Sequence, residues 1–473
     1  MWYTVAPDTA LIQAIVTGIA TGSMIALGAI GLAMVYSIAE VPNFAHGDLL
    51  TLGAYTALLV NKPGDVPLLD LLATGTQTAS FPGLVAVFCL AAAGVLGAVY
   101  ALGGVDALLG SWWPIDPPAP AAAAVHVVAA AAVGLVAAWG APSIVAGMIF
   151  SGAVVAVLAP LQERYVFEKF REKGVSLAMM LVVSLAVAFV LRFSVQTVFG
   201  GTARSYSIQP TVELFGASIN VAVVKLIDLY FAGGGFFLQV SDPVTDAVLF
   251  AGSWSWLVVT AIVLASAAVG YAAYRFRRGE RAILGPYLLG TIAGLVAFVG
   301  FGSVLAAGGT VPESPIYSSR VSLSVLRAFI IVLALAMMGM LHTLLRATKL
   351  GKAMRATSDN RELAQIRGID TGRVTMSVWV LAGLFAGIGG VTLGFLFGTL
   401  TITMGFFILL PMFAAVILGG ITIYGALLGS YIVGLSMEVG LFAIPGLSAT
   451  YRVSVAFVVL ILVLLVKPEG ITG

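Results

Sequence analysis

Charged residues are scarce in this sequence: Asp, Glu, Lys and Arg make up only 9% of its 473 residues, whereas 60% are hydrophobic. A soluble domain has about a quarter of its residues charged. So few charges could not cover the water-facing surface of a chain of this length. The scarcity excludes a soluble protein and indicates an integral membrane protein.

Cysteine and histidine are nearly absent as well. The single cysteine, Cys89, excludes an intramolecular disulfide framework and a CxxC metal site. The three histidines, at positions 46, 126 and 342, are too scattered to indicate a metal site. We therefore expect neither a metal nor a cofactor.

Motifs for nucleotide binding and catalysis are also missing. The one Gly-Lys pair, Gly351-Lys352, is followed by Ala353, and Arg346 stands where a phosphate-binding loop would begin with glycine. No Ser/His/Asp or paired-carboxylate arrangement is present, and nothing indicates nucleic acid as a partner. We expect a protein that is not an enzyme and does not hydrolyse ATP itself.

Long apolar runs take the place of these motifs. A transmembrane helix needs about 20 apolar residues. The spans predicted on this basis are 8–38, 45–61, 84–109, 120–139, 141–161, 174–199, 249–274, 282–308, 322–346, 373–397, 402–418, 424–444 and 449–466. We therefore predict an all-α, polytopic membrane helix bundle with Gly-rich, partly discontinuous helices.

The basic residues gather in three loops and indicate the orientation of the spans. The loops 163–174, 275–281 and 346–373 fall on the same side of the predicted spans, together with Lys467. Cytoplasmic loops carry an excess of Lys and Arg. We expect a multi-pass protein of the cytoplasmic membrane with its N-terminus outside and its C-terminus inside. The first Lys or Arg is Lys62, so we expect a retained first span rather than a signal peptide.

The longest polar segment, residues 346–373, is called the charged loop below. Its apolar residues recur every three or four positions, which predicts amphipathic helix. Ser358 or Asp359 is expected to cap a second short helix that ends at Gly368. Two interpretations remain open, a solvated connector and a docking surface.

A second polar stretch, "AEVPNFAHGDLLTLGAY" (39–55), interrupts two apolar segments. Pro42 removes a backbone donor and Gly47 permits positive φ, so both favour a break in the helix. Backbone broken at membrane depth is tolerated only beside protein or a water-filled path. The stretch is therefore either a discontinuous segment that lines a path or a plain turn at the headgroup level.

Glu438 and Arg452 are the only charges between Val374 and Val466. Charges in apolar spans usually face a bundle interior or one another. A hairpin around Pro445 would bring the two side chains to similar depth. The alternative is that Arg452 extends to the outer interface and Glu438 lies on a short helix near water.

Four stretches carry a resemblance to a known family. They are "GLAMVYSIAEVPNFAHGDLLTLGAY" (31–55), "ERYVFEKFREKG" (163–174), "GKAMRATSDNRELAQIRGID" (351–370) and "YRVSVAFVVLILVLLVKPEGITG" (451–473). In their order and spacing they resemble the permease subunits of ABC importers for branched-chain amino acids, and the related permeases for urea and short amides. Two departures are Phe167-Glu168-Lys169, which replaces Arg-Pro-Leu, and Val453, where Asp is usual.

The resemblance implies a transport subunit that moves branched-chain amino acids or similar small polar solutes. It implies two ABC ATPase subunits, a second related permease or second copy, and an extracellular solute-binding protein as partners in the lipid bilayer. The substrate path it implies contains Asn43, Phe44, His46 and Gly47. Glu438 and Arg452 are further candidates for the path, because they are isolated charges in apolar spans. The ATPase-coupling residues it implies are Gly351, Lys352, Arg355, Asp359, Asn360, Ala364 and Gly368.

An ion-coupled secondary transporter is the alternative. That class expects ionisable residues at the membrane midplane and matching broken helices in two halves. Glu438 is the sole acidic residue between Val374 and Val466, and no clear half-to-half repeat is visible.

The resemblance also suggests a division of the chain. About nine core spans lie in 1–61, which holds the Asn-Phe-Ala-His-Gly break, in 141–225, and in 321–473, which holds the charged loop. Residues 62–140 and 226–320 lie outside the likeness, and each is expected to form an inserted apolar helix pair at the periphery.

Overall fold

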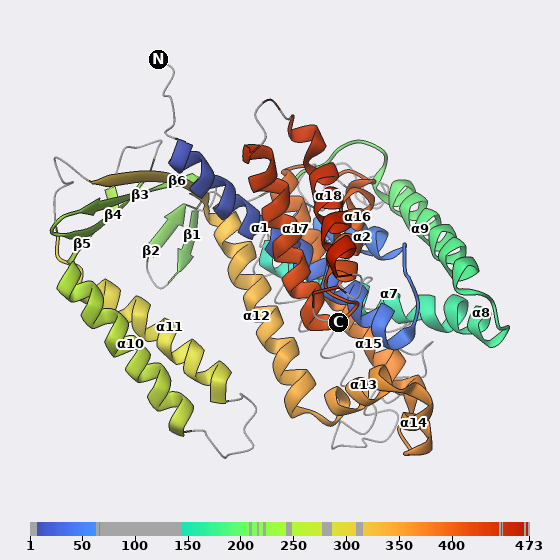
Figure 1. The fold of residues 1–473 in the computed structure, drawn as a ribbon. Coiled ribbons are helices and arrows are strands. Elements are labelled where there is room, and N and C mark those ends of the chain that lie inside the picture. Colours follow the sequence, from blue (N-terminus) through green and yellow to red (C-terminus); the bar gives the residue numbers. More distant parts are fainter. Residues whose placement is uncertain are drawn as a thin grey trace. The chain divides into compact units, whose positions relative to one another are not determined.

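The computed structural model describes residues 7–62, 66, 144–207, 211–214, 217–220, 224–242, 248–276, 286–308, 316–443, 446, 448–467 and 470–471 (Figure 1). Apart from residues 62 and 66, the helix pair expected at 62–140 lies outside the described residues.

Most of the described chain is helical. The longer helices are α1 (Pro7–Ala39), α2 (His46–Asn61), α7 (Ile144–Gln162), α9 (Leu177–Phe199), α10 (Trp256–Phe276), α11 (Pro286–Val304), α12 (Val325–Ala347), α15 (Thr371–Phe397), α16 (Met404–Leu418), α17 (Ile423–Ala443) and α18 (Arg452–Val466). The short ones are η3 (Glu163–Phe167), α8 (Glu168–Glu172), α13 (Lys349–Asp359), α14 (Arg361–Ile366) and η4 (Ala449–Tyr451). Among the described helices, six are long and apolar enough to cross a membrane. The prediction of a polytopic helix bundle is confirmed, and the number of spans stays a prediction.

The chain divides into two compact units. One comprises Met1–Thr17 with Pro210–Arg355, and the other comprises Gly18–Gln209 with Ala356–Gly473.

The first unit contains strands that the sequence analysis does not predict. A hairpin of β1 (Thr211–Leu214) and β2 (Ala217–Asn220) precedes an antiparallel sheet of order β5-β4-β3-β6. The sheet strands are β3 (Val224–Ala232), β4 (Gly235–Ser241), β5 (Val248–Ser255) and β6 (Tyr317–Ser324). The span predicted at 249–274 begins at Trp256 instead, because residues 248–255 pair with β4. A short apolar run cannot be assigned to helix or strand by periodicity alone.

Helices α10 and α11 of this unit lie side by side (Figure 1). Their backbones approach closely at Gly270 and Gly290: a Cβ on either glycine would lie 2.8 Å from the carbonyl oxygen of the other. Small residues allow such contact between apolar helices. Large apolar side chains cover the outside of the pair; Leu257 is 84% exposed. This surface has the chemistry that lipid requires.

The second unit has its core around α2 and α15. Helix α15 contacts α7 and α2, and α2 also contacts α9 and α16. The largest fully buried side chains of this core include Trp379, Tyr55, Phe167 and Phe385. The polar stretch 39–55 therefore enters the most densely surrounded part of the unit.

Candidate functional site

The helix break between α1 and α2 lies inside the second unit. Helix α1 ends at Ala39, and Glu40 follows with a φ of 57°, a value that non-glycine residues rarely adopt. His46, the first residue of α2, donates from Nε2 to the carbonyl oxygen of Gly28 at 3.0 Å. Gly28 lies eleven residues before Ala39, about 16 Å back along α1. The segment 40–45 therefore returns beside α1 instead of turning beyond its end.

Two backbone N–H groups in the break donate hydrogen bonds to side chains. The Phe44 N–H donates to Ser184 Oγ of α9 at 3.1 Å, and the Ala45 N–H donates to Asn43 Oδ1 at 3.0 Å. Asn43 and His46 are fully buried. Asn43 Nδ2 and His46 Nδ1 have no hydrogen-bonding partner among the described residues. Two buried polar atoms of the break are therefore left without a hydrogen bond among the described residues.

The first turn of α2 lies against α16. A Cβ on Gly47 would lie 2.5 Å from the Gly405 carbonyl oxygen, so the close approach of the two helices requires glycine there. Thr51 Oγ1 accepts a hydrogen bond from the Gly405 N–H at 3.0 Å. The rings of Phe44 and Phe413 lie 4.9 Å apart. The break is thus held between α1, α9 and α16.

An ion pair that sequence reasoning missed joins the break to α9. Arg192 donates from Nε to Asp48 Oδ1 at 2.9 Å and from Nη2 to Asp48 Oδ2 at 3.0 Å. The two side chains are 12% and 1% exposed. The guanidinium also lies over the rings of Phe406 and Phe189, at 4.9 and 5.5 Å. An arginine within an apolar helix was the available signal.

Glu438 and Arg452 form the second group of expected path residues. Arg452 Nε lies 3.3 Å from Glu438 Oε1, so the structure favours the pairing of the two interpretations left open. Thr21 Oγ1 of α1 donates to the same carboxylate at 3.3 Å. Thr21 and Gly28 are seven residues apart on α1, about 10 Å. The six expected path residues therefore form two separate groups along α1.

The charged loop folds into α13 and α14. Lys352, Arg355 and Asp359 are exposed on α13. Gly351 is buried, and a Cβ on it would meet the backbone of Leu344 and Leu345. Gly351 therefore serves close packing within the first unit.

Helix α14 departs in detail from the sequence prediction. Asn360 Oδ1 accepts from the Leu363 N–H at 2.8 Å, so Asn360 is the capping residue and the prediction of Ser358 or Asp359 was wrong. The helix ends at Ile366, and Gly368 follows with a φ of +80°. Glycine adopts that backbone conformation without strain.

The apolar residues of α14 face two ways. Ala364 is 3% exposed and lies inside, so it is not part of the surface. Leu363 and Ile366 are 51% and 81% exposed. The exposed face of α14 thus carries two large apolar side chains among its charges.

Two hydrogen bonds tie the charged loop to the end of α1. Ser358 Oγ donates to the Ser37 carbonyl oxygen at 3.4 Å, and Arg361 Nη1 donates to the Ile38 carbonyl oxygen at 3.3 Å. Both carbonyls belong to the last turn of α1, where no helical donor remains for them. The loop thus holds the residues directly before the break.

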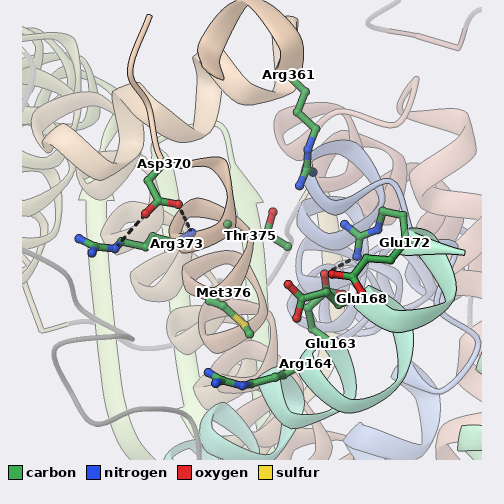
Figure 2. Close-up of a pocket in the computed structure, with 11 residues that line it drawn as sticks. Glu163, Arg164, Glu168, Glu172, Arg361, Asp370, Arg373, Thr375 and Met376 are labelled. Atoms are coloured by element: carbon green, nitrogen blue, oxygen red, sulfur yellow. Dashed lines mark hydrogen bonds and ion pairs between the residues drawn. The ribbon is translucent and has the colours of Figure 1, made fainter. Parts of the chain in front are cut away.

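A charged groove of about 650 Å³ lies beside these contacts, between η3–α8 and α14–α15 (Figure 2). Glu163 forms an ion pair with Arg171 in its wall. Arg361 points from α14 toward the side that carries Glu163 and Glu172 (Figure 2). Burial raises the pKa of the Glu163 carboxyl above its ordinary value, and the nearby Arg171 opposes that shift. Among the described residues, no cluster of His, Cys, Asp and Glu could hold a metal ion.

Comparison with known proteins shows what the chain is similar to. A family model described as "Branched-chain amino acid transport system / permease component" matches residues 240–464. The high-affinity branched-chain amino acid transport system permease proteins LivH of Salmonella typhimurium and Escherichia coli are 29% identical over 281 residues, which cover 54% of this chain and 89% of each relative.

A third relative is the high-affinity branched-chain amino acid transport system permease protein BraD of Pseudomonas aeruginosa. It is 31% identical over 154 residues, which cover 32% of this chain and 49% of the relative. No solved structure matches the chain. The apolar helix bundle, the family model and these relatives together support a permease subunit of branched-chain amino acid ABC importers.

Proposed function

We propose that this chain imports branched-chain amino acids or similar small polar solutes across the cytoplasmic membrane, driven by separate ATPase subunits. The names of the relatives support this substrate class. The related permeases for urea and short amides supply the alternative substrates. ATP hydrolysis belongs to the partners, in keeping with the missing phosphate-binding loop.

The observation that carries the proposal is the contact between Arg361 and Ile38. It connects α14 to the last turn of α1, one residue before Ala39, where that helix ends. A displacement of α14 is thereby passed to the segment 40–45 and to the first turn of α2. An ATPase that moves the charged loop would open and close the helix break.

The ATPase subunits dock on the charged loop. Leu363 and Ile366 of α14 supply apolar contacts, and Lys352, Arg355 and Asp359 of α13 supply exposed charges. This proposal makes the loop cytoplasmic, in keeping with its basic residues. A second permease, or a second copy, and an extracellular solute-binding protein complete the importer.

Asn43 and His46 line the substrate path where it crosses the break, and their unpaired nitrogens support this role. Glu438 and Arg452 form a second, separate contact point along α1. The pair α10–α11 is a peripheral insertion whose apolar surface faces lipid. Residues 62–140 are proposed to be peripheral as well.

An ion-coupled transporter fits less well. Its coupling ion would need an accessible carboxylate in the apolar spans. Glu438 is 8% exposed and already contacts Arg452 and Thr21.

Co-purification tests the proposed function. The tagged chain is co-expressed with the ATPase and solute-binding subunits encoded beside it and is extracted in mild detergent. We expect an ATPase to remain bound, and ATP hydrolysis to rise when the binding protein carries a branched-chain amino acid. A chain that purifies without an ATPase would contradict the proposal.

A further inference from the structure

Asp48 and Arg192 bring two opposite charges deep into an apolar part of the second unit. Arg192 is the only charged residue of α9. It lies fifteen residues after Leu177, about 22 Å along the helix. A membrane core is about 30 Å thick, so the pair lies within it if α9 crosses the membrane.

Arg192 and the helix dipole of α2 favour negative charge on Asp48. Close to Asp48 in sequence are buried polar atoms that have no hydrogen-bonding partner among the described residues. Asp48 is in the first turn of α2, where the helix dipole stabilises an anion. Two to five residues earlier, Asn43 Nδ2 and His46 Nδ1 are buried without a partner among the described residues. The site therefore holds more hydrogen-bonding capacity than this conformation uses.

An open apolar surface of α9 begins beside the pair. It is formed by Phe189, Val190, Phe193, Ser194, Thr197 and Val198, and Val190 and Phe193 are 66% and 59% exposed. Phe189 belongs to both features, because its ring lies 5.5 Å from the Arg192 guanidinium. The Arg192 cation and this apolar surface thus lie within two turns of α9, and the Asp48 anion pairs with Arg192 from α2.

We propose that Asp48 and Arg192 are the binding site for a zwitterionic aliphatic amino acid in the membrane. Arg192 binds the carboxylate through its two parallel donors, Asp48 accepts from the ammonium group, and the aliphatic side chain lies against the open apolar surface of Phe189 and Phe193. This inference rests on the proposed function, since the helix break must open for the pair to separate.

Charge balance selects the ligand. Separating a buried ion pair leaves two uncompensated charges, which is strongly unfavourable. A zwitterion replaces each lost partner with a charge of the same sign, so the site stays balanced when it opens. A sugar or a neutral amide offers no such charges. The pair therefore discriminates between classes of solute as well as holding α2 against α9.

The test uses a double substitution that removes both charges at nearly constant size, Asp48→Asn with Arg192→Gln. The whole importer, with its ATPase subunits and binding protein, is reconstituted in proteoliposomes. Uptake of radiolabelled leucine and ATP hydrolysis stimulated by the loaded binding protein are measured together. The matched control is Asp228→Asn with Arg320→Gln, which removes another bidentate ion pair, located in the first unit.

We expect the D48N/R192Q importer to hydrolyse ATP near the wild-type rate but to lose leucine uptake by about tenfold or more, as expected when buried charge-assisted hydrogen bonds are lost. The control should retain both activities. Wild-type leucine uptake in D48N/R192Q would overturn the proposal. Loss of ATP hydrolysis together with uptake would also overturn it, since the pair would then be purely structural. A wild-type importer that transports urea or a short amide but not leucine would refute this inference alone, and one that transports none of these solutes would refute the proposed function as well.

Discussion

Arg361 donates a hydrogen bond to the carbonyl oxygen of Ile38, at 3.3 Å, across 323 positions of sequence. The donor is on α14 in the charged loop, and the acceptor lies in the last turn of α1 before the helix break. A surface that a soluble subunit can reach is thus joined directly to buried backbone. Through this contact, we expect a movement of α14 to displace the end of α1 and the helix break after it.

Replacing Arg361 with alanine should separate docking from transport. The variant loses the contact with Ile38 while Leu363 and Ile366 remain exposed. A hydrogen bond from a charged group contributes about 1.5–3 kcal/mol, so we expect roughly a tenfold or larger fall in uptake. ATPase binding, measured by co-purification, should stay at the wild-type level. Arg361→Lys, which keeps the charge, serves as the matched variant and should retain more uptake.

Replacing Leu363 and Ile366 with aspartate should weaken docking itself. Burying each apolar side chain at an interface stabilises the complex by about 1–3 kcal/mol, and a buried aspartate would oppose it. Both variants should recover less ATPase on co-purification while the permease still inserts into the membrane. Lys173→Ala, an exposed substitution after α8, is the control. Unchanged recovery of ATPase would show that α14 is not the docking surface.

Alanine at Asn43 or His46 should impair transport with little change in abundance. Asn43→Ala leaves the buried Ala45 N–H without its acceptor, and His46→Ala removes the hydrogen bond from α2 to the Gly28 carbonyl of α1. That loss costs about 1–3 kcal/mol, or roughly tenfold in rate. Uptake normalised to protein in the membrane is the measurement. Thr56→Ala, which removes only a bond to the carbonyl of Gly53 in the same helix, should be nearly silent.

Glu163 should make stability depend on pH. Its folded-state pKa is raised, mainly by burial, so the folded protein binds a proton more readily than the unfolded chain. Stability from this group is complete below the unfolded pKa and is lost as pH rises through the folded pKa. The midpoint temperature of unfolding in detergent should therefore fall in the wild type as the pH rises from the unfolded to the folded pKa of Glu163. In Glu163→Gln the unfolding temperature should depend less on pH in this range. The same pH dependence in the wild type and in Glu163→Gln would show that Glu163 is not responsible for it.

The sequence allowed the helices to be predicted where apolar runs are long and bounded by polar loops. The span predicted at 373–397 is α15 within two residues, and that at 424–444 is α17 within one. The strands were missed because 248–255 is apolar and short, and pairing with β4, not local periodicity, decides its conformation. Ser358 and Asp359 were plausible caps by type, but only the backbone geometry at Asn360 shows which residue accepts the bond.

The candidate site was predictable only in part for a similar reason. The cluster from Glu40 to Asp48 and the pair Glu438–Arg452 stood out because polar residues are rare in this chain. Asp48 and Arg192 are 144 positions apart, and no local pattern links them. The inward position of Ala364 likewise depends on packing that spacing does not reveal.

ATP-driven import in proteoliposomes tests the central claim most directly. Vesicles that contain this chain, its ATPase subunits and ATP inside receive the binding protein and radiolabelled leucine outside. The account predicts accumulation of leucine that requires ATP and falls about tenfold when Arg361 is replaced by alanine. Accumulation that follows an ion gradient without ATP, or that is unchanged by Arg361→Ala, would contradict it.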